Sequence, residues 1–146
     1  IVMERRSMNE QEKQDYLRNF SGEPVCGFAV MSGSFSEGID LKGERLIGAI
    51  IIGVGLPALG VERDIISQRY EDKGFEFAYQ YPGMLRVVQT AGRVIRSPQD
   101  RGVICLVDSR YQQARYKRLF PEHWKVNDVE SIGNLKRDLS KFWEEC

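Results

Sequence analysis

Residues 87–102, VVQTAGRVIRSPQDRG, place three polar side chains that could bind an anion inside an otherwise apolar stretch: Gln89, Arg93 and Arg96. A guanidinium group is seldom seated among valines and isoleucines without an anionic partner. Its planar fork of N–H donors matches the oxygens of a phosphate group. The segment therefore raises the question of which anion these side chains hold.

A helix over residues 83–96 would gather Arg86, Gln89, Arg93 and Arg96 within an arc of roughly 100°. The rest of its circumference is apolar, which predicts burial on several sides and a polar arc that faces a specific cleft. Two interpretations stay open: the arginines form internal salt bridges, or they present their forks to phosphate oxygens. The acids available for internal pairing are Glu37, Asp40 and Asp64.

A second polar segment, MSGSFSEGIDLKG at residues 31–43, directly follows a short apolar run. Its glycines and serines would let backbone amides and hydroxyls approach a phosphate or a sugar closely. The segment matches neither the Walker A pattern nor the G-x-G-x-x-G dinucleotide fingerprint. Glu37 and Asp40 fit better as partners of hydroxyls, an arginine or a water, and an ordinary Ser/Gly turn is the plainer alternative.

Apolar runs alternate with amphipathic segments along the chain, and this alternation predicts the fold class. We expect strands at CGFAVM (26–31), LIGAIIIGVGL (46–56) and GVICLV (102–107), each buried on both faces. Helices are expected from Asn9 as N-cap, over 61–74 with Gly74 as its C-terminal residue, over 83–96, over 109–120, and from Asp128 onward. The prediction is an α/β fold with an open, mostly parallel sheet and helices on both faces. Ligands of such sheets bind at the carboxyl ends of the strands.

Composition narrows the function classes. Lys+Arg and Asp+Glu balance at 21 each, so nucleic-acid binding would need a local basic surface. Three dispersed cysteines, Cys26, Cys105 and Cys146, and the single His123 offer no metal-ligand set, so no metal site is expected. Cys26 and Cys105 are expected to be buried free thiols in a reducing, cytoplasmic compartment. No apolar stretch approaches 18 residues, so no membrane span is expected.

Two further segments each allow a nucleic-acid-binding and a structural interpretation. GFEFAYQYPG (74–83) places aromatic residues at every second position, which suits either stacking on single-stranded bases or one wall of a core. The basic residues of 109–120 could contact backbone phosphates or form a solvated face.

GSFSEGIDLKG, followed about fifty residues later by QTAGRVIR, resembles motifs V and VI of superfamily 2 helicases, most closely the DinG/XPD-type DNA helicases. The resemblance extends to about Trp124. It implies a RecA-like fold: residues 1–127 would be the second motor domain of a helicase, with an N-terminal truncation, and 128–146 its C-terminal helix.

The resemblance also implies roles for the arginines. ATP with Mg²⁺ would bind between two motor domains, mainly to the first one. Arg96 would be the arginine finger on the γ-phosphate, and Arg93 would act beside it on the same phosphate or the transition state. Gln89 would position this network.

The loop residues receive implied roles as well. Asp40 would lie near the ribose or couple the two sites, and Glu37 and Gly38 would shape the loop around the nucleotide. Ser34 and Ser36 would lie close to the backbone of single-stranded DNA.

The sequence lacks a Walker A motif, a D-E-A-H-like magnesium motif and the cysteines of an iron–sulfur cluster. The resemblance places these parts in an N-terminal motor domain of the same polypeptide. We therefore expect an ATP-dependent DNA helicase whose isolated second domain does not hydrolyse ATP. The alternative is a non-catalytic RecA-like adaptor that binds nucleic acid or protein and has lost its motor. A Walker A lysine in the parent reading frame would separate the two.

Overall fold

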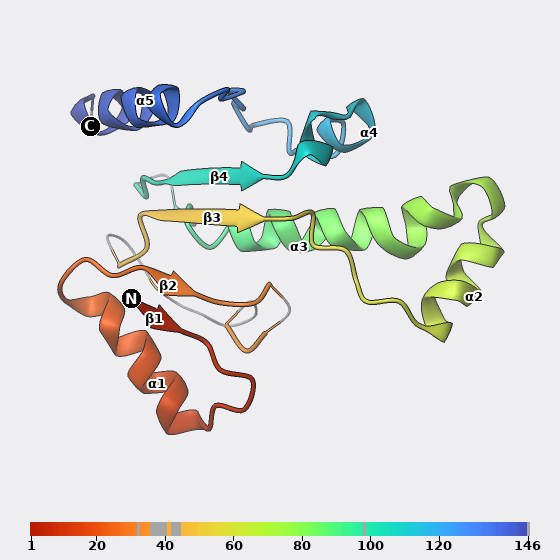
Figure 1. Ribbon diagram of the computed structural model, residues 1–146, viewed down its shortest axis with the longest axis horizontal. Coiled ribbons are helices and arrows are strands. Elements are labelled where there is room, and N and C mark those ends of the chain that lie inside the picture. Colours follow the sequence, from red (N-terminus) through yellow and green to blue (C-terminus); the bar gives the residue numbers. More distant parts are fainter. Residues whose placement is uncertain (32, 36–40, 42–44, 98, 146) are drawn as a thin grey trace.

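The computed structural model describes residues 1–31, 33–35, 41, 45–97 and 99–145 (Figure 1). The strands are β1 (Val2–Met3), β2 (Gly27–Phe28), β3 (Gly48–Ile52) and β4 (Val103–Val107). The α-helices are α1 (Glu10–Arg18), α2 (Val61–Arg69), α3 (Tyr81–Ala91), α4 (Ala114–Lys117) and α5 (Ile132–Glu144). Short 3-10 turns cover Asn19–Ser21, Glu71–Lys73 and Ser109–Gln112, and a π-helical segment covers Glu76–Gln80.

The described strands form two parallel pairs. β3 pairs with β4 from Gly48 opposite Val103 to Ile52 opposite Val107, and β1 pairs with β2 over two residues. Figure 1 shows the four strands in the order β4, β3, β2, β1. The predicted α/β class with parallel strands is confirmed, although each strand is shorter than its apolar run suggested.

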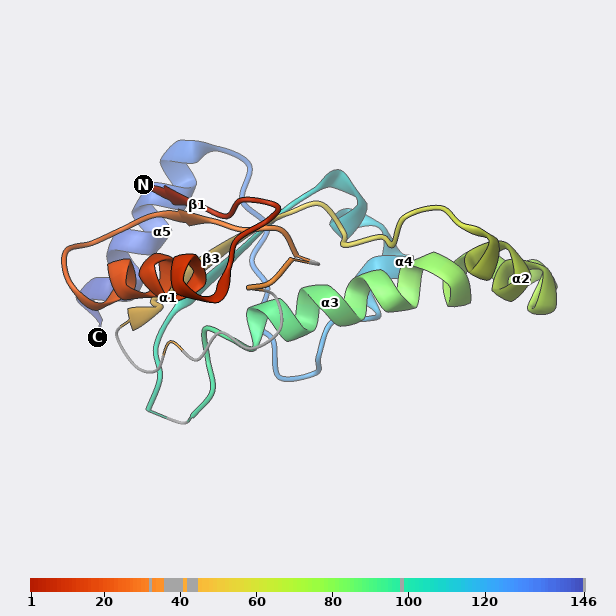
Figure 2. The same ribbon diagram turned by 90° about the horizontal axis from the view of Figure 1, so that it is seen from below.

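α3 runs along the β3–β4 pair and forms the main core with it (Figures 1 and 2). α3 continues without a break from the π-helical segment Glu76–Gln80, and Pro82 is its second residue. The buried side chains of this core are Ile51, Val54, Met84, Val87, Ala91, Tyr111 and Tyr116. The helix that precedes the predicted anion site is therefore seated on the sheet.

Two glycines let the backbones of α3 and of the turn after β3 touch. A Cβ on Gly83 would lie 2.6 Å from the Val54 carbonyl oxygen, and one on Gly55 would lie 2.7 Å from the Gly83 carbonyl oxygen. Gly55 also has φ +63°, a left-handed conformation that other residues rarely adopt. Neither position has room for a side chain, so the contact fixes how α3 approaches β3.

The region around α4 is tied to the same core by buried polar groups. The Tyr111 hydroxyl donates to the Gly53 carbonyl oxygen at 2.6 Å, and burial raises the pKa of Tyr111 to about 12. Gln80, which is fully buried, donates to the Arg115 carbonyl oxygen at 2.6 Å. These bonds hold the chain after β4 against the strand end and the π-helical segment.

Three burial expectations are wrong. Strand 26–31 was predicted to be buried on both faces, but both residues of β2 are exposed, Phe28 by 52%. Ile50 and Ile52, on the face of β3 that points away from α3, are 70% and 73% exposed, although strand 46–56 was predicted to be buried on both faces. α5 lies on the side of the β3–β4 pair opposite α3 (Figure 2), but it leaves these two isoleucines uncovered. Cys26 is exposed rather than buried, since β2 spans only the two residues after it, whereas Cys105 in β4 is partly buried.

Several helix boundaries also differ from expectation. α2 ends at Arg69, and Gly74 has a right-handed conformation. A Cβ on Gly74 would lie 2.2 Å from the Ser67 carbonyl oxygen, so close packing rather than a left-handed helix end requires glycine there. The predicted helix over 109–120 divides into a 3-10 turn and the short α4.

The aromatic residues of 74–83 do not form a core wall. The segment is helical, so alternate residues do not share a face, and Ala78 and Gln80 are its buried side chains within the π-helical segment. Phe75 and Phe77 are 43% and 37% exposed, and they stack on Tyr79 and Tyr70.

We predict that Gly83→Ala lowers the free energy of unfolding by about 1–3 kcal/mol, because the new methyl group overlaps the backbone at Val54. Gly133→Ala is the matched control, since Gly133 also stands in the first turn of a helix and its Cβ would meet nothing closer than 3.8 Å. Gly133→Ala should be neutral or stabilising by up to about 1 kcal/mol. Urea denaturation measures both, and equal effects would show that the α3–β3 contact is not tight.

Candidate functional site

The two arginines of the predicted anion site lie on a turn directly after α3. The helix ends at Ala91, not near Ser97, and the chain then tightens: Arg93 N–H bonds to the Thr90 carbonyl oxygen at 3.1 Å. Gly92 lowers the helical propensity where the change occurs. We call residues 92–97 the arginine turn.

A carboxylate holds the arginine turn from its far side. One oxygen of Asp100, Oδ2, accepts the backbone N–H groups of Arg96 at 2.8 Å and Ser97 at 2.9 Å. The bond from the Arg96 N–H, followed by those from Ser97, holds the pKa of Asp100 below its ordinary value of 3.8. The Arg96 Nε also donates to the Arg93 carbonyl oxygen at 3.0 Å, which directs the Arg96 side chain along the turn.

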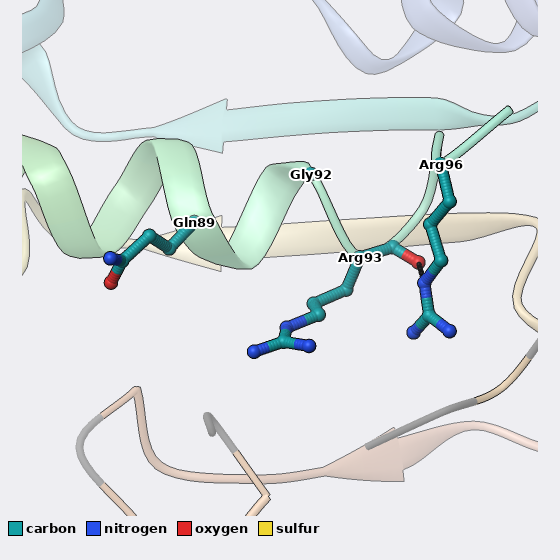
Figure 3. A pocket seen from close by; sticks show the side chains of 4 residues that line it. All are labelled: Gln89, Gly92, Arg93 and Arg96. Carbon is teal, nitrogen blue, oxygen red and sulfur yellow. Dashed lines mark hydrogen bonds between the residues drawn. The ribbon is translucent and has the colours of Figure 1, made fainter. Parts of the chain in front are cut away.

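Gln89, Gly92, Arg93 and Arg96 line one open depression of about 350 Å³. Figure 3 shows the side chains of Gln89, Arg93 and Arg96 pointing away from β4, with the two guanidinium groups on the same side of the turn. Gly92 lies between Gln89 and Arg93 and adds no side chain to the depression. Two planar cations that open onto one depression form a site suited to an anion with several oxygens, such as a phosphate.

The alternative, that the arginines form internal salt bridges, can be tested for Arg93 and for Asp64. Within the described ranges, no residue bonds to the Arg93 guanidinium group, and Asp64 does not pair with either arginine. Arg86 is the exception in the predicted polar arc: its Nη1 donates to the Gly55 carbonyl oxygen at 3.3 Å. Arg86 therefore braces α3 against the turn after β3 and does not line the depression.

The second predicted segment, 31–43, is described at residues 31, 33–35 and 41, and Leu41 is buried. The Ser34 N–H donates to the Glu4 carboxylate at 2.8 Å, so a nucleic-acid contact from Ser34 would use its hydroxyl group. The other predicted residues of this loop lie outside the described residues: Ser36, Glu37, Gly38 and Asp40.

The basic residues of the 109–120 segment have partners within the protein. The guanidinium of Arg115 also lies 5.9 Å from the centre of the Phe75 ring. The polar partners are Asp108 for Arg110, Gln113 for Arg115, Asp128 for Lys117 and Glu76 for Arg118. This pairing favours a structural face over a phosphate-binding one.

Sequence reasoning missed two residues of this region. Asp100 had a local signal, because an aspartate shortly after a serine often accepts backbone N–H groups in a turn. Glu4 had none, since its backbone partners lie 26 and 30 residues away in the sequence.

The described part of the chain also bears on metals and membranes. Within it, no group of three or more His, Cys, Asp or Glu residues is placed to hold a metal ion. None of its helices combines the length and apolar composition needed to cross a bilayer.

A family model described as the helicase C-terminal domain matches residues 1–127, a span that contains both the depression and the arginine turn. The chain belongs to the helicase C-terminal domain family. The expected relation to DinG/XPD-type superfamily 2 helicases, and with it the RecA-like fold class, is confirmed.

The helicase domain is also similar to individual curated helicases. It is 30% identical over 155 residues to a probable ATP-dependent helicase of Methanocaldococcus jannaschii, covering 94% of this chain and 24% of that protein. It is 34% identical over 151 residues to a regulator of telomere elongation helicase 1 homolog of Drosophila grimshawi, covering 93% and 15%. The general transcription and DNA repair factor IIH helicase subunit XPD of Schizosaccharomyces pombe is 27% identical, covering 82% and 16%. The chain thus spans less than a quarter of the length of these relatives.

We predict that Asp100→Asn removes an acid-sensitive part of the stability. The pKa of Asp100 is lowered in the folded protein, so its contribution is complete above about pH 4 and is lost as the pH falls through the lower, folded value. The difference in unfolding free energy between parent and variant should therefore be constant near neutral pH and shrink below pH 4. Denaturation curves between pH 2 and 7 measure it.

Asp138→Asn is the control for that measurement, because it removes one negative charge from the exposed surface of α5. A parent–variant difference for Asp100→Asn that stays constant down to pH 2 would contradict the assigned hydrogen bonds.

Proposed function

We propose that the helicase domain is the second motor domain of an ATP-dependent DNA helicase and contributes Arg96 as an arginine finger to an ATP site shared with the first motor domain. Arg93 acts beside it on the same phosphate or the transition state, and Gln89 positions the network. The observation that carries the proposal is that these three side chains line one open depression at the end of α3. Family membership supports it.

The chemistry of phosphoryl transfer fits a site built in this way. Negative charge develops on the transferred phosphoryl group, and an arginine that reaches it in the transition state raises the rate by roughly 10³–10⁵. An arginine on a separate domain reaches the phosphate only when the two domains close. Hydrolysis is then coupled to domain closure, and closure and opening with strand contacts on both domains move the motor along DNA.

The lining of the depression suits a phosphate better than a metal ion. Among the described residues, the lining consists of two guanidinium groups, an amide and a glycine, without a carboxylate, and magnesium prefers carboxylate and phosphate oxygens. The helicase domain therefore contributes positive charge to ATP, while the Mg²⁺ ligands belong to the first motor domain of the same polypeptide.

The loop of residues 31–43 completes the proposal. Asp40 lies near the ribose or couples the two sites, Glu37 and Gly38 shape the loop around the nucleotide, and Ser34 and Ser36 contact single-stranded DNA. The support is the match of the family model across this segment. A cytoplasmic location belongs to the same proposal and rests on free, dispersed thiols such as Cys26 and Cys105.

The test is Arg96→Ala in the full-length polypeptide. We expect the DNA-stimulated ATPase rate to fall by about 10³-fold or more, because the transition-state charge loses its cation. Binding of ATP, measured with a fluorescent analogue, should stay largely intact. Arg101→Ala is the matched control, because Arg101 is an exposed arginine of the next loop and does not line the depression.

Normal turnover in Arg96→Ala would remove the arginine-finger assignment. A full-length parent that binds DNA but shows no ATP turnover and carries no Walker A lysine would instead support the adaptor alternative. Arg93→Lys adds a finer distinction: it keeps the charge but loses the paired donors, so a strong loss of rate there indicates two-pronged phosphate binding.

A further inference from the structure

Glu4 connects the end of β1 to residues 30–34, which precede the SEGID sequence at 36–40. Its backbone N–H donates to the Phe28 carbonyl oxygen at 2.8 Å and so continues the β1–β2 pairing by one residue. Its carboxylate reaches further along the same chain: Oε2 accepts the Val30 N–H at 2.7 Å, and Oε1 accepts the Ser34 N–H at 2.8 Å. We call this arrangement the Glu4 clamp.

The Glu4 clamp uses both oxygens of the carboxylate, and only a carboxylate can do this. Hydrogen bonds from N–H groups to a charged acceptor are short and strong, and here they close a turn in which Gly33 N–H also bonds to the Val30 carbonyl oxygen at 2.8 Å. A glutamine in place of Glu4 would replace one acceptor by an NH₂ donor that faces a backbone N–H. One of the two bonds would then be lost.

Gly33 is shaped to the Glu4 clamp. A Cβ on Gly33 would lie 2.4 Å and 2.6 Å from the two carboxylate oxygens of Glu4. An alanine there would therefore push the carboxylate away from the two amides that it binds. Glu4 and Gly33, which are distant in sequence, are thus both needed for the conformation of residues 30–34.

The charge of Glu4 serves the backbone and not a neighbouring cation. Among ion pairs between described residues, none involves Glu4, and the adjacent Arg5 pairs with Glu12 at 2.8 Å. A partly buried carboxylate bonded to two backbone amides fixes the path of the main chain more tightly than a surface ion pair does.

We propose that Glu4 is a positioning residue: by binding the amides of Val30 and Ser34 it sets the path of the chain just before the proposed nucleotide-binding residues Glu37 and Asp40, and thereby the coupling between DNA binding and ATP turnover. The inference rests on the proposed function, because it assigns Glu4 a part in the communication between the two sites of that motor. Glu4 itself touches neither ligand. Its role is exerted through residues 30–34.

The first measurement tests whether the hydrogen bonds of the Glu4 clamp exist, and it does not depend on ATPase activity. Amide hydrogen exchange in the full-length polypeptide should become about tenfold faster in Glu4→Gln at Val30 or at Ser34, whichever amide faces the new NH₂ group, which is the loss expected for one hydrogen bond to a charged group. Glu10→Gln is the matched control, because Glu10 forms only an exposed pair with Lys13. Unchanged protection in Glu4→Gln would overturn the Glu4 clamp itself.

The second measurement tests the coupling between DNA binding and ATP turnover. The ratio of DNA-stimulated to basal ATPase rate should fall about tenfold in Glu4→Gln and in Gly33→Ala, and stay at the parent value in Glu10→Gln. In a Glu4→Ala background, Gly33→Ala should add little, because the carboxylate that its methyl group displaces is gone. A merely structural role would lower both rates together and leave the ratio unchanged.

The outcomes separate this inference from the proposed function. A parent polypeptide without DNA-stimulated turnover would overturn the proposed function and the coupling role with it, while the exchange data would still decide whether the Glu4 clamp exists. A stimulated parent in which Glu4→Gln exchanges faster at an unchanged rate ratio would overturn the positioning role alone. Additive effects of Glu4→Ala and Gly33→Ala would contradict the assigned contact.

Discussion

The backbone contact between α3 and the turn after β3 is the constraint on which the candidate site depends. With Gly55 and Gly83 in direct approach and Val54 and Val87 buried beneath them, the first turn of α3 has one position on the sheet. α3 is eleven residues long, about 16 Å, and ends at Ala91, directly before Gly92. Because the helix is rigid and is seated at its first turn, its last turn has a fixed position too, and the arginine turn begins there.

Two carboxylates fix the backbone of the neighbouring loops, and both do so by accepting hydrogen bonds from main-chain N–H groups. Asp100 binds the backbone amides of Arg96 and Ser97, and Glu4 binds those of Val30 and Ser34. In both cases the acid is satisfied by main-chain N–H groups and holds a loop in place without depending on an arginine side chain.

Local sequence patterns predicted the parts of this structure that depend on neighbours in the chain. The strands at β3 and β4 and α1 with its Asn9 cap were accessible, because periodicity and capping are local. The exposure of Ile50 and Ile52 was not, since an apolar run does not reveal which of its faces a helix covers. The end of α3 at Ala91 was missed because apolar periodicity continues through Val94 and Ile95 after the hydrogen bonds have changed. The Glu4 clamp depends on chain segments that meet only in the folded state.

The outer face of β3 has a practical consequence for work with the chain on its own. Among the described strands, β3 pairs with β4 alone, so it carries two exposed isoleucines next to an edge that bonds to no other described strand. Exposed apolar side chains of this kind favour association between molecules, and β3 carries no charged side chain to oppose it. We therefore expect Ile50 and Ile52 to promote association of the chain at high protein concentration. Lysine substitutions at Ile50 or Ile52 are the direct way to a soluble sample in which the arginine turn keeps its support.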